Sequence, residues 1–125
     1  MKNVIILAVI LAGITFSSAY SADGALVKIQ NSSNEDFSSV TARIGGKEFS
    51  FADLKAGKAT PYFKIGKTFL TGYFEVVTAK DTLKYSPSAE EIIKQEEYDK
   101  GHFIMELNIE VSDGHRQLTV KGYKK

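Results

Sequence analysis

The stretch HFIMELNIEVSDGHRQLTVKGY, residues 102–123, decides the fold class of this chain. Apolar and polar residues alternate on both sides of Asp113-Gly114, and a period of two is typical of a strand with one buried face. Asp-Gly is a strong signal for a two-residue turn between paired strands, so the stretch predicts a β-hairpin. Its expected inward side chains are Phe103, Met105, Leu107, Ile109, Val111, Leu118 and Val120, and its expected outward ones are His102, Ile104, Glu106, Asn108 and Glu110.

The same alternation recurs along most of the chain before this hairpin. Gly45-Gly46 and Lys80-Asp81 mark two further tight turns. Seven or eight short strands in one domain, residues 22–125, predict an all-β, antiparallel two-sheet β-sandwich of immunoglobulin-like type, with a small barrel as the alternative. The predicted strands before the final hairpin cover residues 25–30, 38–44, 47–51, 59–65, 72–79 and 82–85.

One segment, residues 86–101, departs from the alternation. Ser88 followed by Glu91 is a capping-box signal for the start of a helix, and Gly101 is a signal for its end. The segment therefore predicts one short helix near residues 88–98, inserted between strands.

The N-terminus has the features of a secretory signal peptide. Lys2 precedes an unbroken run of apolar residues and Gly at 4–14, and small residues follow this run. The run is too short to cross a hydrocarbon core, which takes roughly 20 residues. We expect a signal peptide at residues 1–21, cleaved after Ala19 or Ser21, although an uncleaved tethering helix is an alternative. The mature protein is then exported, periplasmic or extracellular, and has no transmembrane segment.

The composition argues against several classes of function. The chain has no Cys, which excludes disulfides, thiol catalysis and Cys-based zinc sites. It has 16 Lys and Arg against 15 Asp and Glu, and Lys2 is the one charged residue of the first 21, so the mature chain is neutral. Nucleic-acid and anionic-membrane binding rest on a basic excess. We therefore expect no nucleic-acid partner, and nothing in the sequence indicates a cofactor.

The tripeptide Gly66-Lys67-Thr68 matches the end of a nucleotide-binding P-loop. That motif requires a glycine five residues earlier, where this chain has Pro61, and a helix afterwards, where it has the β-like stretch FLTGYFEVV. The tripeptide therefore predicts a loop between strands.

The loop at 65–72 is the expected binding surface, through Lys67, Phe69 and Leu70. Residues 54–74 contain four lysines and no acidic residue, interleaved with aromatic residues. Such a pattern suits an anionic ligand, but it also suits an edge strand that lysines protect from pairing with another chain. We favour the edge interpretation of the lysines, and we expect a protein or glycan partner in the cell envelope.

Catalytic and metal sites have weaker sequence support. His102, Glu106 and Glu110 share one strand face, but four residues along a strand span about 13 Å, too far for a single ion. The alternative function is a hydrolase-type enzyme that uses His102 and the acidic residues between Glu90 and Glu97. The preferred hypothesis is a non-enzymatic binding module with neither catalytic nor metal-ligating residues.

Three stretches carry a family resemblance. VKIQNSSNEDFSSVTARI (27–44), DLKAGKATPYFKI (53–65) and GHFIMELNI (101–109) resemble small exported bacterial β-sandwich proteins of uncharacterised function. The resemblance covers most of the mature chain and rests on strand and turn residues. It implies an exported sandwich and brings no catalytic residues.

Overall fold

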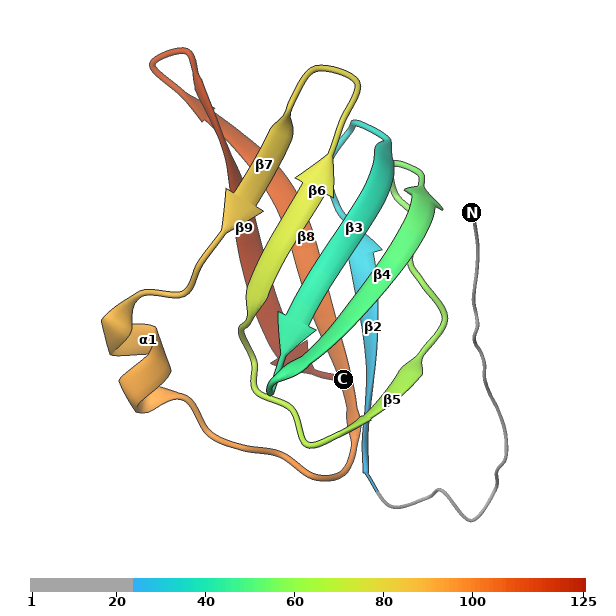
Figure 1. Cartoon of the computed structure of the whole chain (residues 1–125), viewed down its shortest axis with the longest axis vertical. Coiled ribbons are helices and arrows are strands. Elements are labelled where there is room, and N and C mark those ends of the chain that lie inside the picture. The colour runs from blue at the N-terminus through green and yellow to red at the C-terminus, as the bar shows by residue number, and fades with distance from the viewer. Residues whose placement is uncertain (1–23) are drawn as a thin grey trace.

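A computed structural model describes residues 24–125, which form two four-stranded sheets packed face to face (Figure 1). One sheet has the order β5-β2-β8-β9 and the other the order β4-β3-β6-β7. The predicted two-sheet β-sandwich is confirmed, while the predicted signal peptide lies outside the described residues. The elements are β2 (Ala25–Asn31), β3 (Phe37–Ile44), β4 (Lys47–Leu54), β5 (Phe63–Gly66), β6 (Tyr73–Val77), β7 (Thr82–Tyr85), α1 (Ala89–Lys94), β8 (His102–Ser112) and β9 (His115–Lys124).

One ladder of the sandwich is parallel, and the other ladders of the two sheets are antiparallel. β2 runs parallel to β8, with Leu26 opposite His102 and Asn31 opposite Leu107. Parallel neighbours require a long crossover connection. Here the crossover contains a whole sheet, because β3, β4, β6 and β7 are formed before the chain returns to β8. The first and last parts of the domain therefore lie side by side.

The core lies between the two sheets and is built from the alternate residues that face inward. Burying one large apolar side chain contributes about 1.5–3 kcal/mol to folding. The chain has no Cys, so this packing acts without the support of disulfides. The fully buried apolar side chains include Val27, Ile29, Phe37, Val40, Ile44, Ile65, Val76, Phe103, Met105 and Leu107.

Asn31, at the end of β2, is a fully buried polar side chain whose amide nitrogen and oxygen both form hydrogen bonds. Its Nδ2 donates to the carbonyl oxygens of Glu35 at 2.7 Å and Leu54 at 3.0 Å. Its Oδ1 accepts from the N–H of Ser33 at 3.0 Å and from the Ser33 hydroxyl at 2.6 Å. These bonds compensate for the burial of the amide and fix the β2–β3 loop where the chain passes from one sheet to the other.

The expected turns at Gly45-Gly46, Lys80-Asp81 and Asp113-Gly114 all join paired antiparallel strands, and the first and the last share one backbone geometry. Gly45 and Gly46 have φ values of 59° and 81°, and Asp113 and Gly114 have φ values of 51° and 77°. Positive φ at both central positions is the type I′ geometry, whose twist matches that of the flanking strands. The turn predictions for the β3–β4 and β8–β9 hairpins are therefore confirmed.

Three predicted elements are shorter than expected, and one of them is the strand predicted at 72–79, which forms only at Tyr73–Val77. The strand predicted at 59–65 forms only at Phe63–Gly66. Pro61 lacks an N–H, and the Thr60 Oγ1 accepts from the Ile29 N–H at 3.0 Å where a carbonyl would stand in a regular ladder. The helix predicted over 88–98 ends at Lys94, because Gln95 has an extended backbone with ψ of 146°.

Two residues of β8 differ from the predicted pattern of burial. Ile104 lies on the outer face as expected but is only 6% exposed, because Lys28 and Tyr123 flank it on the neighbouring strands. Val111 was expected in the core but is 64% exposed. β2 pairs with β8 only as far as Leu107, so the end of the β8–β9 hairpin extends beyond the sandwich as a two-stranded ribbon (Figure 1).

Candidate binding surface

The connection between β7 and β8, residues 86–101, leaves the sandwich and carries α1 (Figure 1). The helix begins with the predicted capping box: the Ser88 Oγ accepts from the Glu91 N–H at 3.1 Å, and the Glu91 carboxylate accepts from the Ser88 N–H at 2.9 Å. The same carboxylate accepts the hydroxyl of Tyr85 on β7 at 3.0 Å. The bond from the Ser88 backbone, followed by that from Tyr85, lowers the pKa of Glu91. These contacts attach the start of α1 to the edge of the sandwich.

The helix itself is exposed on all sides, since none of its residues is buried. Ile92 is 42% exposed and Ile93 is 82% exposed. Glu90 and Lys94 form an ion pair at 3.1 Å between two exposed side chains. An exposed pair at this spacing contributes about 0.3–0.5 kcal/mol. Helix α1 therefore presents two adjacent apolar side chains, together with charged ones, to solvent.

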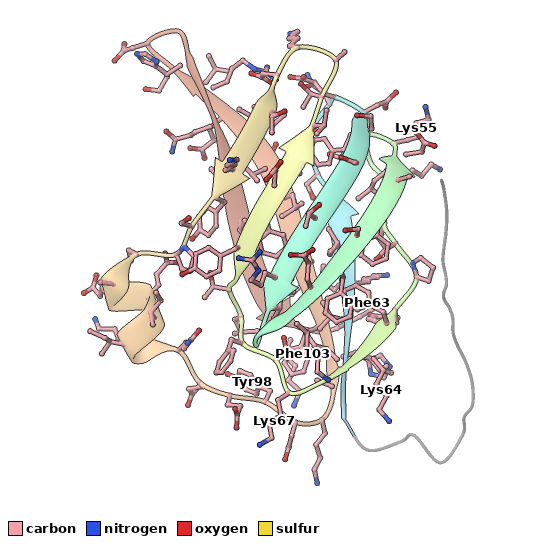
Figure 2. All side chains as sticks on the ribbon, in the orientation of Figure 1. Lys55, Phe63, Lys64, Lys67, Tyr98 and Phe103 are labelled. Carbon is pink, nitrogen blue, oxygen red and sulfur yellow. The ribbon has the colours of Figure 1, made fainter. Side chains whose placement is uncertain are left out.

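The far end of this connection is attached to the loop that follows β5. Thr68 and Tyr98 exchange two backbone N–H to carbonyl hydrogen bonds, both at 2.8 Å. The Tyr98 ring packs against the ring of Phe103 at a centroid distance of 5.0 Å (Figure 2). Lys67 and Glu97 add an exposed ion pair at 3.8 Å. The connection is thus held at both ends, while the helix between them has no buried residue.

The three residues predicted to bind a partner occupy different environments in the 65–72 loop. Lys67 is exposed and pairs with Glu97, whereas Phe69 and Leu70 are both partly buried. Leu70 packs against the core. The Leu70 carbonyl also lies so close to Gly122 on β9 that an added Cβ there would approach its oxygen to 2.2 Å. Leu70 therefore contributes to packing, and Lys67 is the most exposed of the three.

The Gly66-Lys67-Thr68 tripeptide forms a loop, as predicted. Thr68 is fully buried, and its hydroxyl donates to the carbonyl of Phe69 at 3.0 Å. The chain then continues into strand β6 rather than into a helix. A P-loop needs a helix N-terminus behind its phosphate-binding amides. This loop lacks that feature.

The residues of the hydrolase alternative are engaged in other contacts. Glu90 pairs with Lys94, and Glu97 pairs with Lys67. The Glu91 carboxylate accepts from the Ser88 N–H in the capping box. The Glu96 carboxylate accepts from the Tyr98 hydroxyl at 3.0 Å. His102, on β8, lies on the outer face of the β5-β2-β8-β9 sheet. Its ring packs edge-on against the Tyr62 ring at a centroid distance of 4.9 Å. Within residues 24–125, no group of three or more His, Asp or Glu side chains is placed to hold a metal ion.

A shallow hollow of about 130 Å³ lies on the outer face of the β4-β3-β6-β7 sheet. Ligand pockets usually measure roughly 300–1,000 Å³, so this hollow is small for a substrate cleft. It contains the Arg43–Glu48 ion pair, at 3.0 Å, and the half-exposed ring of Tyr73. Its lining comprises Thr41, Arg43, Glu48, Tyr73, Phe74, Glu75, Lys84, Tyr85 and Ser86.

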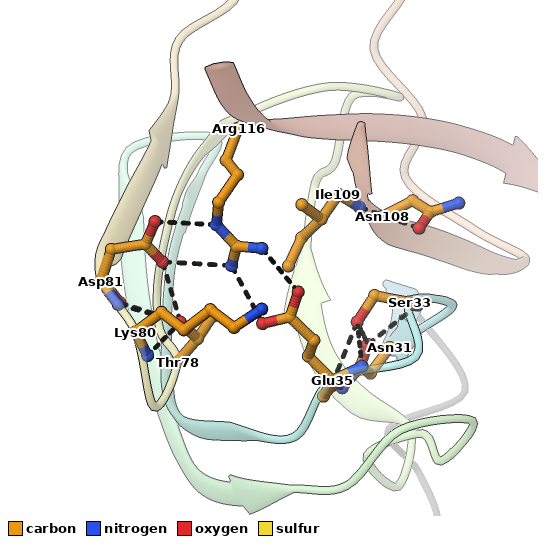
Figure 3. Close-up of polar contacts among 9 residues, drawn as sticks. All are labelled: Asn31, Ser33, Glu35, Thr78, Lys80, Asp81, Asn108, Ile109 and Arg116. Carbon is orange, nitrogen blue, oxygen red and sulfur yellow. Dashed lines mark hydrogen bonds and ion pairs between the residues drawn. The ribbon is translucent and has the colours of Figure 1, made fainter. Parts of the chain in front are cut away.

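The densest charged cluster lies at the opposite end of the sandwich from the 65–72 loop and centres on Arg116 (Figure 3). Its guanidinium binds Glu35 through two hydrogen bonds, at 2.7 and 2.9 Å, and Asp81 through two more, at 2.9 and 3.2 Å. The hydrogen bonds from Arg116 lower the pKa of both carboxyl groups, and those from Glu35 and Asp81 raise the pKa of Arg116. All three side chains are partly buried.

The Arg116 cluster joins parts of the chain that are distant in sequence. Arg116 belongs to β9 of one sheet, Asp81 to the β6–β7 turn of the other, and Glu35 to the loop that connects the two sheets. The Nε, Nη1 and Nη2 atoms of Arg116 each donate at least one hydrogen bond to a carboxylate oxygen of Glu35 or Asp81. The cluster is therefore an ionic link between the sheets. Sequence reasoning missed it because its partners lie 35 and 81 positions from Arg116.

Comparison with models of known protein families, with curated proteins and with solved structures found no match. The described part of the chain has no helix with the length and hydrophobicity needed to span a membrane.

Proposed function

We propose that the chain is an exported, non-enzymatic interaction module that binds a protein partner of the cell envelope through α1. The observation that carries this proposal is the exposure of Ile92 and Ile93 on a helix that has no buried residue. Export is proposed from the N-terminal sequence. The engaged carboxylates between Glu90 and Glu97 give no support to the hydrolase alternative.

The way α1 is held supports a role in binding. A helix of six residues does not form by itself in water, because nucleation is costly. Ordering the backbone costs about 1–2 kcal/mol per residue, and α1 has no buried residue to offset this cost. The capping box, the Tyr85–Glu91 bonds and the Thr68–Tyr98 bridge supply the order instead. The result is a pre-ordered apolar element, which lowers the entropic cost of docking.

The composition of α1 suits recognition of a groove on another protein. Amphipathic helices bind such grooves through apolar anchors while charged residues form the rim. Ile92 and Ile93 supply the anchors, and Glu90 and Lys94 supply the rim. A purely aliphatic anchor also favours a protein over a glycan, and the chain contains no Trp for stacking on sugar rings.

Site-specific cross-linking tests this proposal. A photo-reactive amino acid placed at Ile93 should cross-link a discrete envelope protein in the cells that produce the chain. The same amino acid at Val111, another exposed apolar position on the β8–β9 ribbon, is the matched control. Adding Ile92→Ser to the Ile93 probe should abolish the product. Equal products from positions 93 and 111, or none from position 93, would contradict the proposal.

The export part of the proposal has its own measurement. Cell fractionation followed by intact-mass analysis should find the chain outside the cytoplasm, starting at Tyr20 or Ala22. A full-length chain in the cytoplasmic fraction would contradict export. This result is independent of the cross-linking result.

A further inference from the structure

The outer face of the β5-β2-β8-β9 sheet carries a cluster of lysine and tyrosine side chains. This sheet lies behind the other one in the view of Figure 1, so its outer face points away from the viewer. The face is formed by the alternate residues of the four strands that do not enter the core. We give the name lysine–tyrosine face to six residues: Lys28, Tyr62, Lys64, Glu106, Lys121 and Tyr123.

The central row of this face crosses the sheet from one edge to the other. Lys28 on β2 is opposite Ile104 on β8, which in turn is opposite Tyr123 on β9. Tyr62 directly precedes β5, and the Lys28 Nζ lies 4.9 Å from the centroid of its ring. These side chains surround Ile104, which is only 6% exposed. The centre of the face is therefore polar and aromatic on its solvent side, although an isoleucine lies beneath it.

Two further lysines flank the central row. Lys64 is opposite Leu26, and Lys121 is opposite Glu106; both lysines are exposed. Among residues 24–125, neither they nor Lys28 have a carboxylate within ion-pair distance. Lysines can protect a sheet edge, but Lys28 belongs to β2, which has neighbours on both sides. The three lysines thus give a neutral chain one face that attracts anions.

Hydrogen-bonding groups lie between these lysines. The Tyr123 hydroxyl donates to the Oε2 of Glu106 at 2.6 Å. The Tyr62 hydroxyl is buried, and it has no hydrogen-bond partner among the residues that the structure describes. Buried hydroxyl groups normally have a partner. Tyr62 therefore retains a hydrogen bond that it can offer to a bound molecule.

We propose that the lysine–tyrosine face binds an acidic polysaccharide. Carboxylates of the polymer pair with the three lysines, and its hydroxyl groups bond to Tyr62 and Glu106. A surface built across four strands is broad and open, so it suits an extended polymer better than a small molecule, which normally binds in a pocket. The face is separate from α1, and this inference therefore goes beyond the proposed function.

Two other polyanions match this face less well. Surfaces that bind membranes insert apolar side chains among the lipids, but none of the exposed large apolar side chains in residues 24–125 lies here. Single-stranded nucleic acids stack their bases on aromatic faces, and Lys28 lies over the ring of Tyr62. Glu106 also repels phosphates, whereas a polysaccharide offers it hydroxyl donors. The charges and the hydrogen-bonding groups together favour the polysaccharide.

Affinity electrophoresis of the purified protein tests this inference. Alginate, a polymer of uronic acids, is the probe, and dextran is the neutral control polymer. Gels that contain alginate should slow the protein, gels that contain dextran should not, and salt should weaken the effect because it screens ion pairs. Lys28→Gln/Lys64→Gln/Lys121→Gln should weaken alginate binding about tenfold or more, since three ion pairs are lost.

Two controls separate this face from general charge and from folding. Lys58→Gln/Lys84→Gln/Lys94→Gln removes the same charge from exposed positions elsewhere and should bind alginate like the wild type. Tyr62→Phe should weaken binding and leave the thermal transition unchanged, because the hydroxyl that it removes has no partner in the described chain. Equal losses in the two lysine variants, or full affinity in Tyr62→Phe, would contradict the assignment of the site.

The probe also decides between the classes of polyanion. A wild-type protein that alginate does not slow, or that dextran slows equally, would overturn the inference. Equal or tighter binding of oligothymidylate, or of vesicles of phosphatidylglycerol, would overturn it in favour of phosphate recognition. Ile92→Ser/Ile93→Ser should bind alginate normally, so this result and the cross-linking from α1 can fail independently.

Discussion

Arg116 on β9 donates two hydrogen bonds, of 2.7 and 2.9 Å, to the carboxylate of Glu35, which lies 81 positions earlier in the chain. The same guanidinium holds Asp81 in the turn between β6 and β7. Bidentate pairing of arginine with carboxylates is stronger and more directional than a single ion pair. This link closes one end of the sandwich, whereas the Thr68–Tyr98 bridge lies at the other.

The Arg116 link predicts a pH dependence of stability. The pKa values of Glu35 and Asp81 are lowered in the folded state from their ordinary values of 4.5 and 3.8. Their stabilising contribution is therefore fully present above these ordinary values and is lost as the pH falls through the lower folded-state values. Denaturant melts across this acidic range should show that Glu35→Gln/Asp81→Asn is less stable than wild type near neutral pH. The difference should shrink on acidification, and a constant difference would contradict the assignment.

Leu107 and Val111 form a matched pair on the same inward-directed face of β8. Leu107 is fully buried, so Leu107→Ala should reduce the free energy of unfolding by about 2–5 kcal/mol, the range for buried leucine truncations. Val111 extends beyond the sandwich, so Val111→Ala should change it by less than about 0.5 kcal/mol. Chemical denaturation of both variants measures these values. Similar losses in the two would show that the hairpin end is packed in solution.

Gly122 is required by a close approach between β9 and the 65–72 loop. A Cβ at this position would lie 2.2 Å from the carbonyl oxygen of Leu70 and 2.9 Å from the Met105 Sδ. Gly122→Ala should therefore lower the free energy of unfolding by about 1–3 kcal/mol or more, the range typical of overpacked sites. Gly57→Ala is the control for conformational strain alone, since Gly57 has φ of 78° and open space around it. Thermal melts should place Gly122→Ala well below Gly57→Ala, and the reverse order would count against the packing of Leu70.

The capping box of α1 should stabilise the helix without stabilising the domain. Ser88→Ala removes a cap contribution of about 0.5–2 kcal/mol, and α1 has no buried residue through which this loss could reach the core. Hydrogen exchange should therefore accelerate at the Ile92 N–H, which donates to the Ser88 carbonyl at 3.0 Å. Exchange in β8 and the global melt should stay unchanged. A lower global stability would mean that α1 is integrated into the fold.

The same variant connects the fold to the proposed function. If α1 binds as a pre-ordered element, Ser88→Ala should weaken cross-linking from position 93 while Ile92 remains in place. A helix that forms only on contact with the partner would be less sensitive to the loss of its free-state cap.

The candidate surface was partly accessible from sequence. Lys67 in the 65–72 loop and the cap at Ser88 follow from local patterns, and they lie at the two ends of the α1 connection: Lys67 pairs with Glu97, and Ser88 begins the helix. The exposure of Ile92 and Ile93 was not predicted, because helical residues that are apolar normally indicate a buried face. The pairing of Thr68 with Tyr98 joins segments 30 positions apart, for which no local pattern is a signal.

The sequence by itself determined what short-range physics controls. The alternation in β2 and β8, the positive φ at Gly45-Gly46 and Asp113-Gly114, and the Ser88 cap depend on residues within a few positions of one another. The tertiary structure alone decided which strands are neighbours. It placed β2 parallel to β8 and Arg116 between Glu35 and Asp81. It also left Val111 exposed, because β2, the neighbour of β8 on one side, pairs with β8 only as far as Leu107. These outcomes depend on how two sheets pack over one core, and that packing energy arises from contacts that are distant in the chain.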